Sequence, residues 1–372
     1  KRQVRKDLAD IFCTNADGIR GKKAVEWKLV DYIAPPSKFD DLTESRVSEL
    51  SNTVKLRNGK IGVTLSKLNR VVNDNEINYE TVLCKIDKES RIANIHILGP
   101  KEDQLISPGD AEELGCNWWP LKFARELEDL ILLLRTNELE VVVFTITSEG
   151  NTENIIKITT IIEENKNNWF VNEIIGFLRR TLSRLDLSSR SIFTIVDNES
   201  CFSGILAELL FCADRTYMLN NALEANSLKG PNISLSKINF ESLEMVNGLT
   251  RLSTRFNSDE LKLNNLRKLI NKEINAEEAY DEGLITVIPD DLDWKEEIRL
   301  SVEERTSFSP DALTGLEANL RFPGKETCET KIFGRLSAWQ NWIFNRPNAV
   351  SEKGALKLFG TGTRAKFDNK RV

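Results

Sequence analysis

The residues with the clearest potential for chemistry lie in one segment of the chain, residues 189–219. The segment reads as a buried strand, a tight turn and a helix that begins near Gly204. Backbone N–H groups at the start of a helix can stabilise negative charge that develops on a carbonyl oxygen. The segment therefore predicts a turn that could serve as an oxyanion hole.

Two other patterns lead to weaker functional hypotheses. His96, the only histidine, lies in an expected strand, and any Ser-His-Asp or metal–histidine mechanism would have to use it. An ordinary strand histidine is the more frequent case, so we expect no hydrolase triad. Residues 360–364, GTGTR, resemble a phosphate-binding loop, but they lack the GK[ST] ending and a following helix. We expect this stretch to be part of a flexible tail.

Composition excludes several classes of function. The net charge of −6 and the lack of a basic stripe with interleaved aromatic residues argue against nucleic-acid binding. No apolar run approaches the roughly 18 residues needed to cross a bilayer, so no membrane role is expected. The six cysteines form no CxxC pair, so the sequence predicts neither a zinc site nor a disulfide framework. A reducing cytoplasm and a site without metal are the resulting expectations.

Strand and helix patterns alternate along most of the chain. This alternation predicts an α/β fold with a largely parallel sheet, whose ligand would lie at the carboxyl ends of the strands. The predicted strands are residues 29–33, 81–86, 92–98, 138–147, 191–196 and 215–219, and 81–86 pairs with 92–98 as a hairpin. The predicted helices are residues 5–13, 22–28, 37–50 with Ser37 as a candidate N-cap, 110–136 with an interruption at Pro120, 169–185 and 204–212.

A short element occurs twice, far apart in the sequence. Residues 23–33 read KAVEWKLVDYI and residues 278–288 read EAYDEGLITVI, so Ala24 pairs with Ala279. The offset, 279 − 24 = 255 residues, is too long for a solenoid repeat and close to the size of a whole domain. We therefore expect the end of one domain followed by all of a second, in a fragment of a longer protein whose first unit begins before Lys1.

Four regions follow from these patterns. Residues 1–53 are expected to be the tail of a truncated first unit, and residues 54–78 a linker. Residues 79–293 are expected to form the second domain. Beyond Trp294 the pattern becomes helical, so residues 294–372 are predicted to form a terminal helical subdomain.

The segment around Gly204 resembles the crotonase (enoyl-CoA hydratase/isomerase) superfamily. In that family a strand leads into a glycine-rich turn, a helix with ELA-like character and an Asp before the next strand. Glu208-Leu209 and Asp214 stand at the matching places. The repeated element supports the same family through an A-x-x-A-x-x-x-G-L pattern at residues 276–284, whereas the first copy has Lys28 in place of the glycine. The resemblance implies a crotonase-like fold that binds acyl-CoA thioesters.

The second unit departs from an active crotonase at its turn. The family's three glycines become Gly204-Ile205-Leu206, and the middle one, whose N–H supports the thioester oxyanion, is Ile205. The glycine-rich stretch before the T-x-R-L sequence is also mostly lost, at residues 241–252. Glu208 matches an acid–base glutamate of the hydratases. With the oxyanion hole degraded, a helical glutamate in a vestigial site is the favoured interpretation.

Nearly the whole chain, and its C-terminal region most specifically, resembles a tandem branch of the superfamily that opens the ring of an epoxidised benzoyl-CoA. The stretches that carry this resemblance are residues 10–18, 188–191, 321–324, 330–336, 338–344, 346–349 and 354–357. The resemblance implies a reaction with two waters that yields formate and dehydroadipyl-CoA semialdehyde. It implies no cofactor beyond the coenzyme A of the substrate, and it places the catalytic loops in the first unit. Catalytic and substrate-binding residues of this chain therefore remain unassigned, with Glu208 as the one weak candidate.

Two other functions stay open at this point. The chain could be a non-catalytic crotonase-like scaffold that dimerises, or a generic enoyl-CoA hydratase that acts through Glu208. Aromatic pairs at Trp118-Trp119 and at Trp339 and Trp342 suit packing or subunit contacts better than adenine stacking. We therefore expect a homo-oligomer, in the simplest case a dimer, that binds an acyl-CoA thioester.

Overall fold

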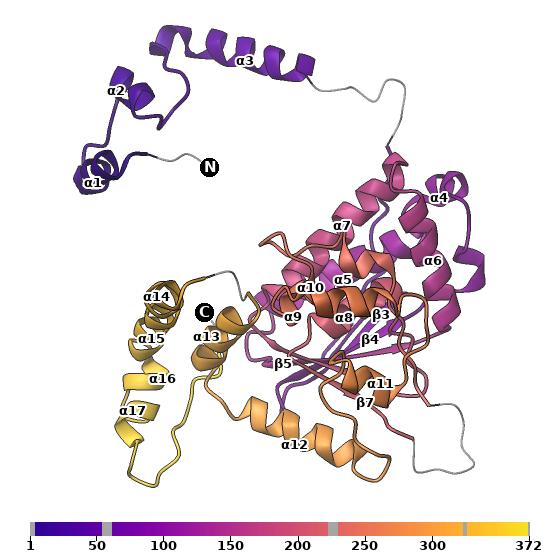
Figure 1. Ribbon diagram of the computed structural model, residues 1–372. Coiled ribbons are helices and arrows are strands. Elements are labelled where there is room, and N and C mark those ends of the chain that lie inside the picture. Colours follow the sequence, from indigo (N-terminus) through magenta and orange to yellow (C-terminus); the bar gives the residue numbers. More distant parts are fainter. Residues whose placement is uncertain (1–3, 54–61, 222–229, 323–325, 371–372) are drawn as a thin grey trace. The chain divides into compact units, whose positions relative to one another are not determined.

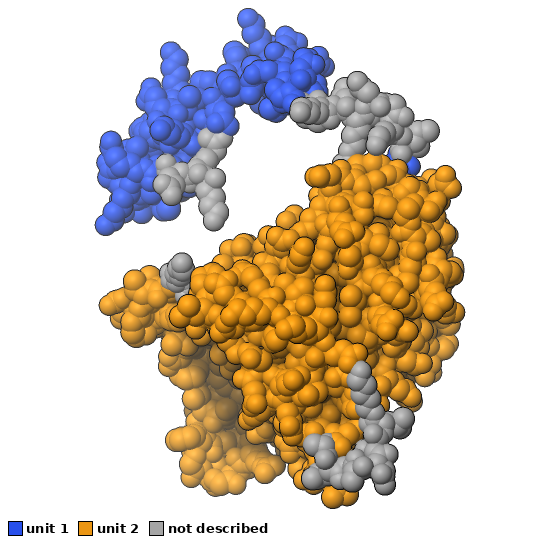
Figure 2. Space-filling view, turned by 45° about the vertical axis from the view of Figure 1, so that its right-hand side comes forward, with its two compact units in different colours: residues 1–62 blue, residues 63–372 orange. Residues whose placement is uncertain are grey.

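A computed structural model of the chain describes residues 4–53, 62–221, 230–322 and 326–370. The chain divides into two units, Lys1–Gly62 and Val63–Val372, which Figure 2 shows in different colours. This division falls inside the predicted linker, residues 54–78, of which 54–61 lie outside the described residues and 63–78 belong to the larger unit. Each unit is described by itself below.

A mixed sheet of seven strands, in sequence order, forms the centre of the larger unit (Figure 1). Strands β1 to β4 pair antiparallel, and β4 to β7 pair parallel. The strands are β1 Val71–Asn73, β2 Glu76–Asn78, β3 Val82–Asp87, β4 Ile92–Leu98, β5 Val143–Glu149, β6 Ser191–Val196 and β7 Arg215–Met218. The predicted α/β fold and the β3–β4 hairpin are confirmed, but the sheet is mixed where a largely parallel one was predicted.

Two of these strands were not expected, because residues 71–78 had been assigned to a linker. β1 and β2 are each three residues long, and Val71 and Val72 are exposed. Strands this short cannot show the alternation of apolar and polar residues that marks a half-buried strand. Only Ile77 of this hairpin is buried, and its strand β2 pairs with β3.

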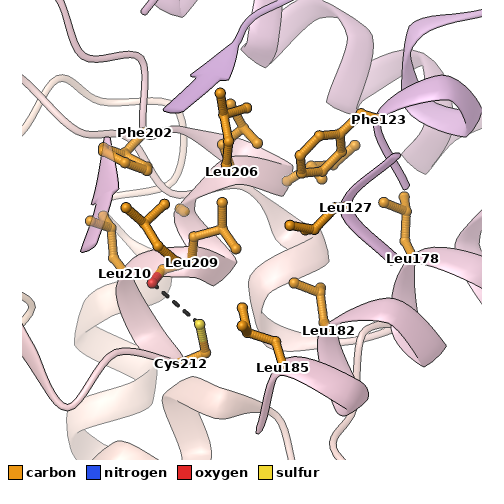
Figure 3. Close-up of a cluster of buried hydrophobic side chains, with 14 of the residues drawn as sticks. Phe123, Leu127, Leu178, Leu182, Leu185, Phe202, Leu206, Leu209, Leu210 and Cys212 are labelled. Atoms are coloured by element: carbon orange, nitrogen blue, oxygen red, sulfur yellow. Dashed lines mark hydrogen bonds between the residues drawn. The ribbon is translucent and has the colours of Figure 1, made fainter. Parts of the chain in front are cut away.

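Helices pack on the sheet through an apolar core. Figure 3 shows the side chains where three helices meet, among them Phe123 of α5, Leu182 of α7 and Leu206 of α8. The helical elements of this part are η2 Glu102–Gln104, α4 Pro108–Leu114, η3 Gly115–Asn117, α5 Trp119–Thr136, α6 Thr152–Glu164, α7 Trp169–Asp186, α8 Gly204–Phe211, η4 Lys237–Phe240, α9 Arg251–Arg255, α10 Glu260–Arg267 and α11 Ala276–Asp281.

The helix predicted for residues 110–136 is interrupted, but not at Pro120. The break is the short turn Gly115–Asn117, where Gly115 has φ +59°. Pro120 lies in the first turn of α5, where a missing backbone N–H costs nothing because no intrahelical acceptor exists for it. Trp118 and Trp119 directly follow the break and are buried, which confirms their packing role.

The C-terminal region is helical, as predicted. Its elements are α12 Trp294–Thr306, α13 Pro310–Leu320, α14 Cys328–Lys331, η5 Ile332–Leu336, α15 Ser337–Phe344, α16 Pro347–Val350 and α17 Ala355–Leu358. In the described ranges, no helix is both long and apolar enough to cross a membrane.

The smaller unit consists of α1 Lys6–Thr14, α2 Gly21–Glu26, η1 Pro36–Lys38 and α3 Phe39–Thr53. The strand predicted for residues 29–33 is wrong: this described stretch has no strand partner, and Val30, Tyr32 and Ile33 are exposed. Ser37 lies inside η1 instead of capping a helix. The apolar residues that suggested a strand are mostly exposed, and the guanidinium of Arg46 lies 4.6 Å from the centre of the Tyr32 ring.

The repeated element has the same backbone hydrogen bonds in both copies. In the first copy Leu29 and Val30 both donate to the carbonyl of Ala24, over 2.9 and 3.4 Å. In the second copy Leu284 and Ile285 both donate to the carbonyl of Ala279, over 2.8 and 3.2 Å.

The residue in the turn also matches between the copies. Lys28 has φ +59° where Gly283 has φ +70°. A lysine adopts this left-handed conformation only at a cost in free energy. The conformation of Lys28 therefore indicates that the end of the preceding helix imposes this turn. The sequence repeat is thus a repeat of local structure.

Candidate functional site

The turn that resembles an oxyanion hole lies between β6 and α8. The turn follows the end of strand β6. Within it, the N–H of Cys201 donates to Ser148 Oγ over 3.0 Å. Gly204 opens α8 with φ +49°. Its own N–H donates to the carbonyl of Ser234 over 3.1 Å. The first N–H of the helix is therefore already bonded within the protein.

The second N–H of the turn is also occupied. Ile205, at the place of the family's middle glycine, donates its N–H to Thr159 Oγ1 of α6 over 3.2 Å. A Cβ atom added to Gly204 would lie only 2.3 Å from the same hydroxyl. Thr159 and Ile205 are both buried. The hydroxyl of Thr159 thus takes the place that a thioester oxygen would need.

Replacing Thr159 with Val is expected to lower the free energy of unfolding by about 1–3 kcal/mol, because the Ile205 N–H then loses its buried acceptor. Urea unfolding followed by circular dichroism measures the change. The control is Thr160→Val, because the Thr160 hydroxyl donates to the carbonyl of Ile156 in its own helix. Equal losses in the two variants would contradict the assignment.

Glu208 is one member of a buried ionic network. Its carboxylate is 1% exposed, accepts from Asn239 Nδ2 over 2.8 Å and lies 2.9 Å from Arg251 Nη1. Arg251 also binds Asp186 through Nη2 over 2.6 Å and the carbonyl of Leu243 over 2.9 Å. Burial raises the pKa of Glu208, and the guanidinium of Arg251 opposes this rise.

This arrangement gives Glu208 a structural task. Both of its oxygens are engaged by side chains of the core, and none of its surface is open to a substrate. A general acid or base has to reach the reacting atom within hydrogen-bond distance. We conclude that, as placed here, Glu208 anchors α8 to Arg251 and to Asn239 of η4.

A second buried network joins the C-terminal helices to the sheet. Asp214 binds Arg321 of α13 over 2.7 Å and accepts from the N–H of Ile192 over 2.7 Å. Glu317, one helical turn before Arg321, accepts from Ser191 Oγ over 2.6 Å. The Asp that matches the crotonase motif therefore has a structural role, since it fixes α13 to the first residues of β6.

Glu317 is expected to make stability depend on pH. Burial, together with the nearby Asp214 carboxylate, raises the pKa of Glu317 to about 8. An unfolded glutamate titrates near about 4.3, so between these values the folded state binds more protons. The contribution of Glu317 to stability is therefore lost as pH rises through this window. Urea unfolding at about pH 5 and about pH 8 should show a smaller decline for Glu317→Gln than for the unchanged chain.

The control for this experiment is Glu303→Gln, because Glu303 is an exposed residue that pairs with Arg299. It should decline with pH as the unchanged chain does. An identical pH dependence in Glu317→Gln and the unchanged chain would contradict the prediction.

The remaining predicted residues lie apart from this turn. His96 of β4 contacts Thr147 Oγ1 over 2.9 Å and lies 3.4 Å from Glu149. Neither of these two contacts involves a serine that could act as a nucleophile. Gly360 and Gly362 have positive φ angles in an exposed stretch that follows α17. Thr159 had not been predicted from the sequence, whereas Arg251 lies within residues 241–252, the stretch compared with the crotonase pattern, and could have been singled out.

Comparisons with known proteins show which proteins this chain resembles. No protein-family model matches the chain. Benzoyl-CoA-dihydrodiol lyase of Aromatoleum evansii is 47% identical over 372 residues, all of this chain, and the chain spans 66% of that relative's length. An enoyl-CoA hydratase structure from Geobacillus kaustophilus aligns with a TM-score of 0.55 at 16% identity, over 79% of this chain and 98% of its own.

A second structure agrees with the first. An enoyl-CoA hydratase/isomerase from Cupriavidus metallidurans aligns with a TM-score of 0.52 at 14% identity, over 83% of this chain and 99% of its own. At these identities the structures show the fold, whereas the sequence match to the lyase covers every residue. The chain therefore has a crotonase-like fold, and benzoyl-CoA-dihydrodiol lyase is a relative along its whole length, although the chain spans less than two thirds of that relative.

Proposed function

We propose that this chain is the supporting part of a lyase that opens the ring of epoxidised benzoyl-CoA. The reaction takes up two waters and yields formate and dehydroadipyl-CoA semialdehyde, with no cofactor beyond the coenzyme A of the substrate. The 47% identity to benzoyl-CoA-dihydrodiol lyase carries this proposal. Chemically, N–H groups that polarise the thioester carbonyl make the conjugated ring electrophilic, so that water can attack it.

The catalytic centre of this lyase lies outside the crotonase fold of Val63–Val372. The turn at Gly204 supports this part of the proposal, because Thr159 and Ser234 already accept its N–H groups. The buried pairing of Glu208 with Arg251 disfavours the alternative of a generic enoyl-CoA hydratase. A purely structural role of Val63–Val372 within the whole enzyme is compatible with both observations.

In this proposal the smaller unit is the end of the first crotonase-like domain, which is the catalytic one. Its α2 and the following turn reproduce the hydrogen bonds of α11 and its turn. In the larger unit, the residues after that turn are buried, as Leu284 and Ile285 show, and Val287 forms a parallel bridge with Tyr217 of β7. Residues 31–33, at the corresponding places, would add to the sheet edge of the catalytic domain.

The whole enzyme is proposed to be a cytoplasmic homodimer that contacts its partner through the C-terminal helices. Large apolar side chains on these helices are exposed in the described chain: Ile332, Phe333, Leu336, Phe344, Val350, Leu356 and Phe359. All six cysteines are free thiols, which suits a reducing compartment. Sedimentation of the chain and of its Phe333→Glu variant tests the contact, because a charge in an apolar interface should shift the dimer towards monomer.

The experiment that tests the function is an assay of formate released from the epoxide of benzoyl-CoA. It compares this chain with the same chain extended at its N-terminus to the next upstream Met in its gene. Formate from the extended protein alone is the expected result. Formate from this chain by itself would contradict the proposed location of the catalytic centre, and no formate from either protein would contradict the proposed reaction.

A further inference from the structure

A cavity lined by arginines lies beside the two ionic networks, at the end of the sheet where β6 and β7 begin. Its volume is about 390 Å³, within the range of roughly 300–1,000 Å³ that ligand sites occupy. The turn at Gly204 follows the opposite end of β6, so the cavity is separate from the closed turn. Its lining comes from the C-terminal end of α7, the segment between α8 and β7, and helices α9, α12 and α13.

Arginines are the main charged residues in the wall of the cavity. Arg251, Arg255, Arg305 and Arg321 line it, whereas Asp186 and Asp214 are its only acidic lining residues in the described chain. Arg251 is paired with Asp186 over 2.6 Å and with Glu208 over 2.9 Å, Arg321 with Asp214 over 2.7 Å, and Arg305 with Glu317 over 3.4 Å.

Arg255 differs from the other three arginines. Its Nε donates to the carbonyl of Gly283 over 2.8 Å, which fixes the guanidinium. Within the described part of the chain it has no carboxylate partner, and its pKa is lowered by burial alone. A partly buried guanidinium without a counter-charge is unfavourable unless an anion joins it.

The rest of the wall adds an apolar side. Phe211, Met245 and Leu320 line the cavity together with the arginines. A ligand with an oxyanion head and a short apolar body would satisfy both kinds of surface, because guanidinium groups bind carboxylates and phosphates through paired N–H donors.

We propose that this cavity binds a small organic anion, whose carboxylate or phosphate head pairs with Arg255 and whose apolar part packs against Phe211, Met245 and Leu320. This site goes beyond the proposed lyase function and does not depend on it. Binding there would tie α9 to α13, and so the core to the C-terminal helices.

The test is isothermal titration of the full chain with hexanoate, acetate and inorganic phosphate in a buffer of low chloride. We expect saturable binding of hexanoate or phosphate, with acetate weaker than hexanoate. Arg255→Gln should weaken that binding roughly ten- to hundredfold, the loss of one charge-assisted contact. The control is Arg267→Gln, because Arg267 bonds to Asn264 and Glu260 on its own helix and does not line the cavity.

A second variant keeps the test decisive if Arg255→Gln fails to fold. Leu320 is 63% exposed, so Leu320→Asp can be tolerated by the fold while it adds a negative charge to the wall. It should weaken anion binding roughly tenfold, and the neutral Leu320→Asn should weaken it less. Absence of saturable binding by all three anions, or unchanged binding in Arg255→Gln or Leu320→Asp, would overturn the proposal.

Discussion

Replacing Arg251 with Met is expected to lower the free energy of unfolding by about 3–5 kcal/mol, because removal of one partner leaves buried charges without compensation. Arg251 is 1% exposed and holds both Asp186 and Glu208. Urea unfolding followed by tryptophan fluorescence and by circular dichroism measures the loss. The control is Arg267→Met, whose side chain is 41% exposed; its effect should be within about 0.5 kcal/mol.

A combined variant separates the charge effect from lost packing. Neutralising the two acids as well, with Asp186→Asn and Glu208→Gln in the Arg251→Met background, should recover a large part of the loss. Buried ion pairs replaced as a whole by neutral residues are often nearly neutral in stability. If the combined variant is less stable than Arg251→Met alone, the network is not held by charge pairing and the account of Glu208 is wrong.

Replacing Ile205 with Gly is expected to lower the free energy of unfolding by about 3–5 kcal/mol, because a buried apolar side chain is removed and a glycine is placed in a helix. Ile205 is 1% exposed, in the fully buried helix α8. Urea unfolding measures the loss. The control is Leu261→Gly in α10, because Leu261 is 80% exposed and only the helix term of about 1 kcal/mol applies there.

The same variant restores the glycine of an active crotonase without restoring activity. The N–H of residue 205 still faces the hydroxyl of Thr159, so the thioester oxygen finds no free donor. We therefore expect no hydration of crotonyl-CoA above the uncatalysed rate. Measurable hydration by Ile205→Gly would show that Thr159 yields to a substrate, and would contradict the closed turn.

Local patterns predicted most of the fold. Residues 191–196 were predicted as the strand that the structure contains, and α7 and α8 begin at the predicted residues. These elements have long apolar patterns because they are buried. The failures include β1 and β2, which are too short to show alternation, residues 29–33, which are apolar but exposed, and α6, a buried helix that was not predicted.

The site depended on contacts that no local pattern contains. Thr159 belongs to no predicted element or motif, and its contact with Ile205 spans 46 residues. The bond between Arg321 and Asp214 spans 107 residues. What the sequence did provide was the substitution of Ile205 for glycine, since a β-branched side chain at a turn built for close approach indicates that the approach no longer occurs. Closure of the turn by a hydroxyl had to come from the structure.

The measurement that tests the central claim most directly is the turnover number of Glu208→Gln in the N-terminally extended enzyme, with formate as the product. The glutamine keeps the size of the side chain, but it has one acceptor oxygen where Arg251 and Asn239 donate to two, so one of these two bonds is lost. We predict a turnover number within about twofold of the unchanged enzyme, together with a lower thermal midpoint, because a structural ion pair is lost. A drop of about a hundredfold or more in a folded variant, the size typical of a lost general acid or base, would show that Glu208 is catalytic and would contradict the supporting role proposed for this chain.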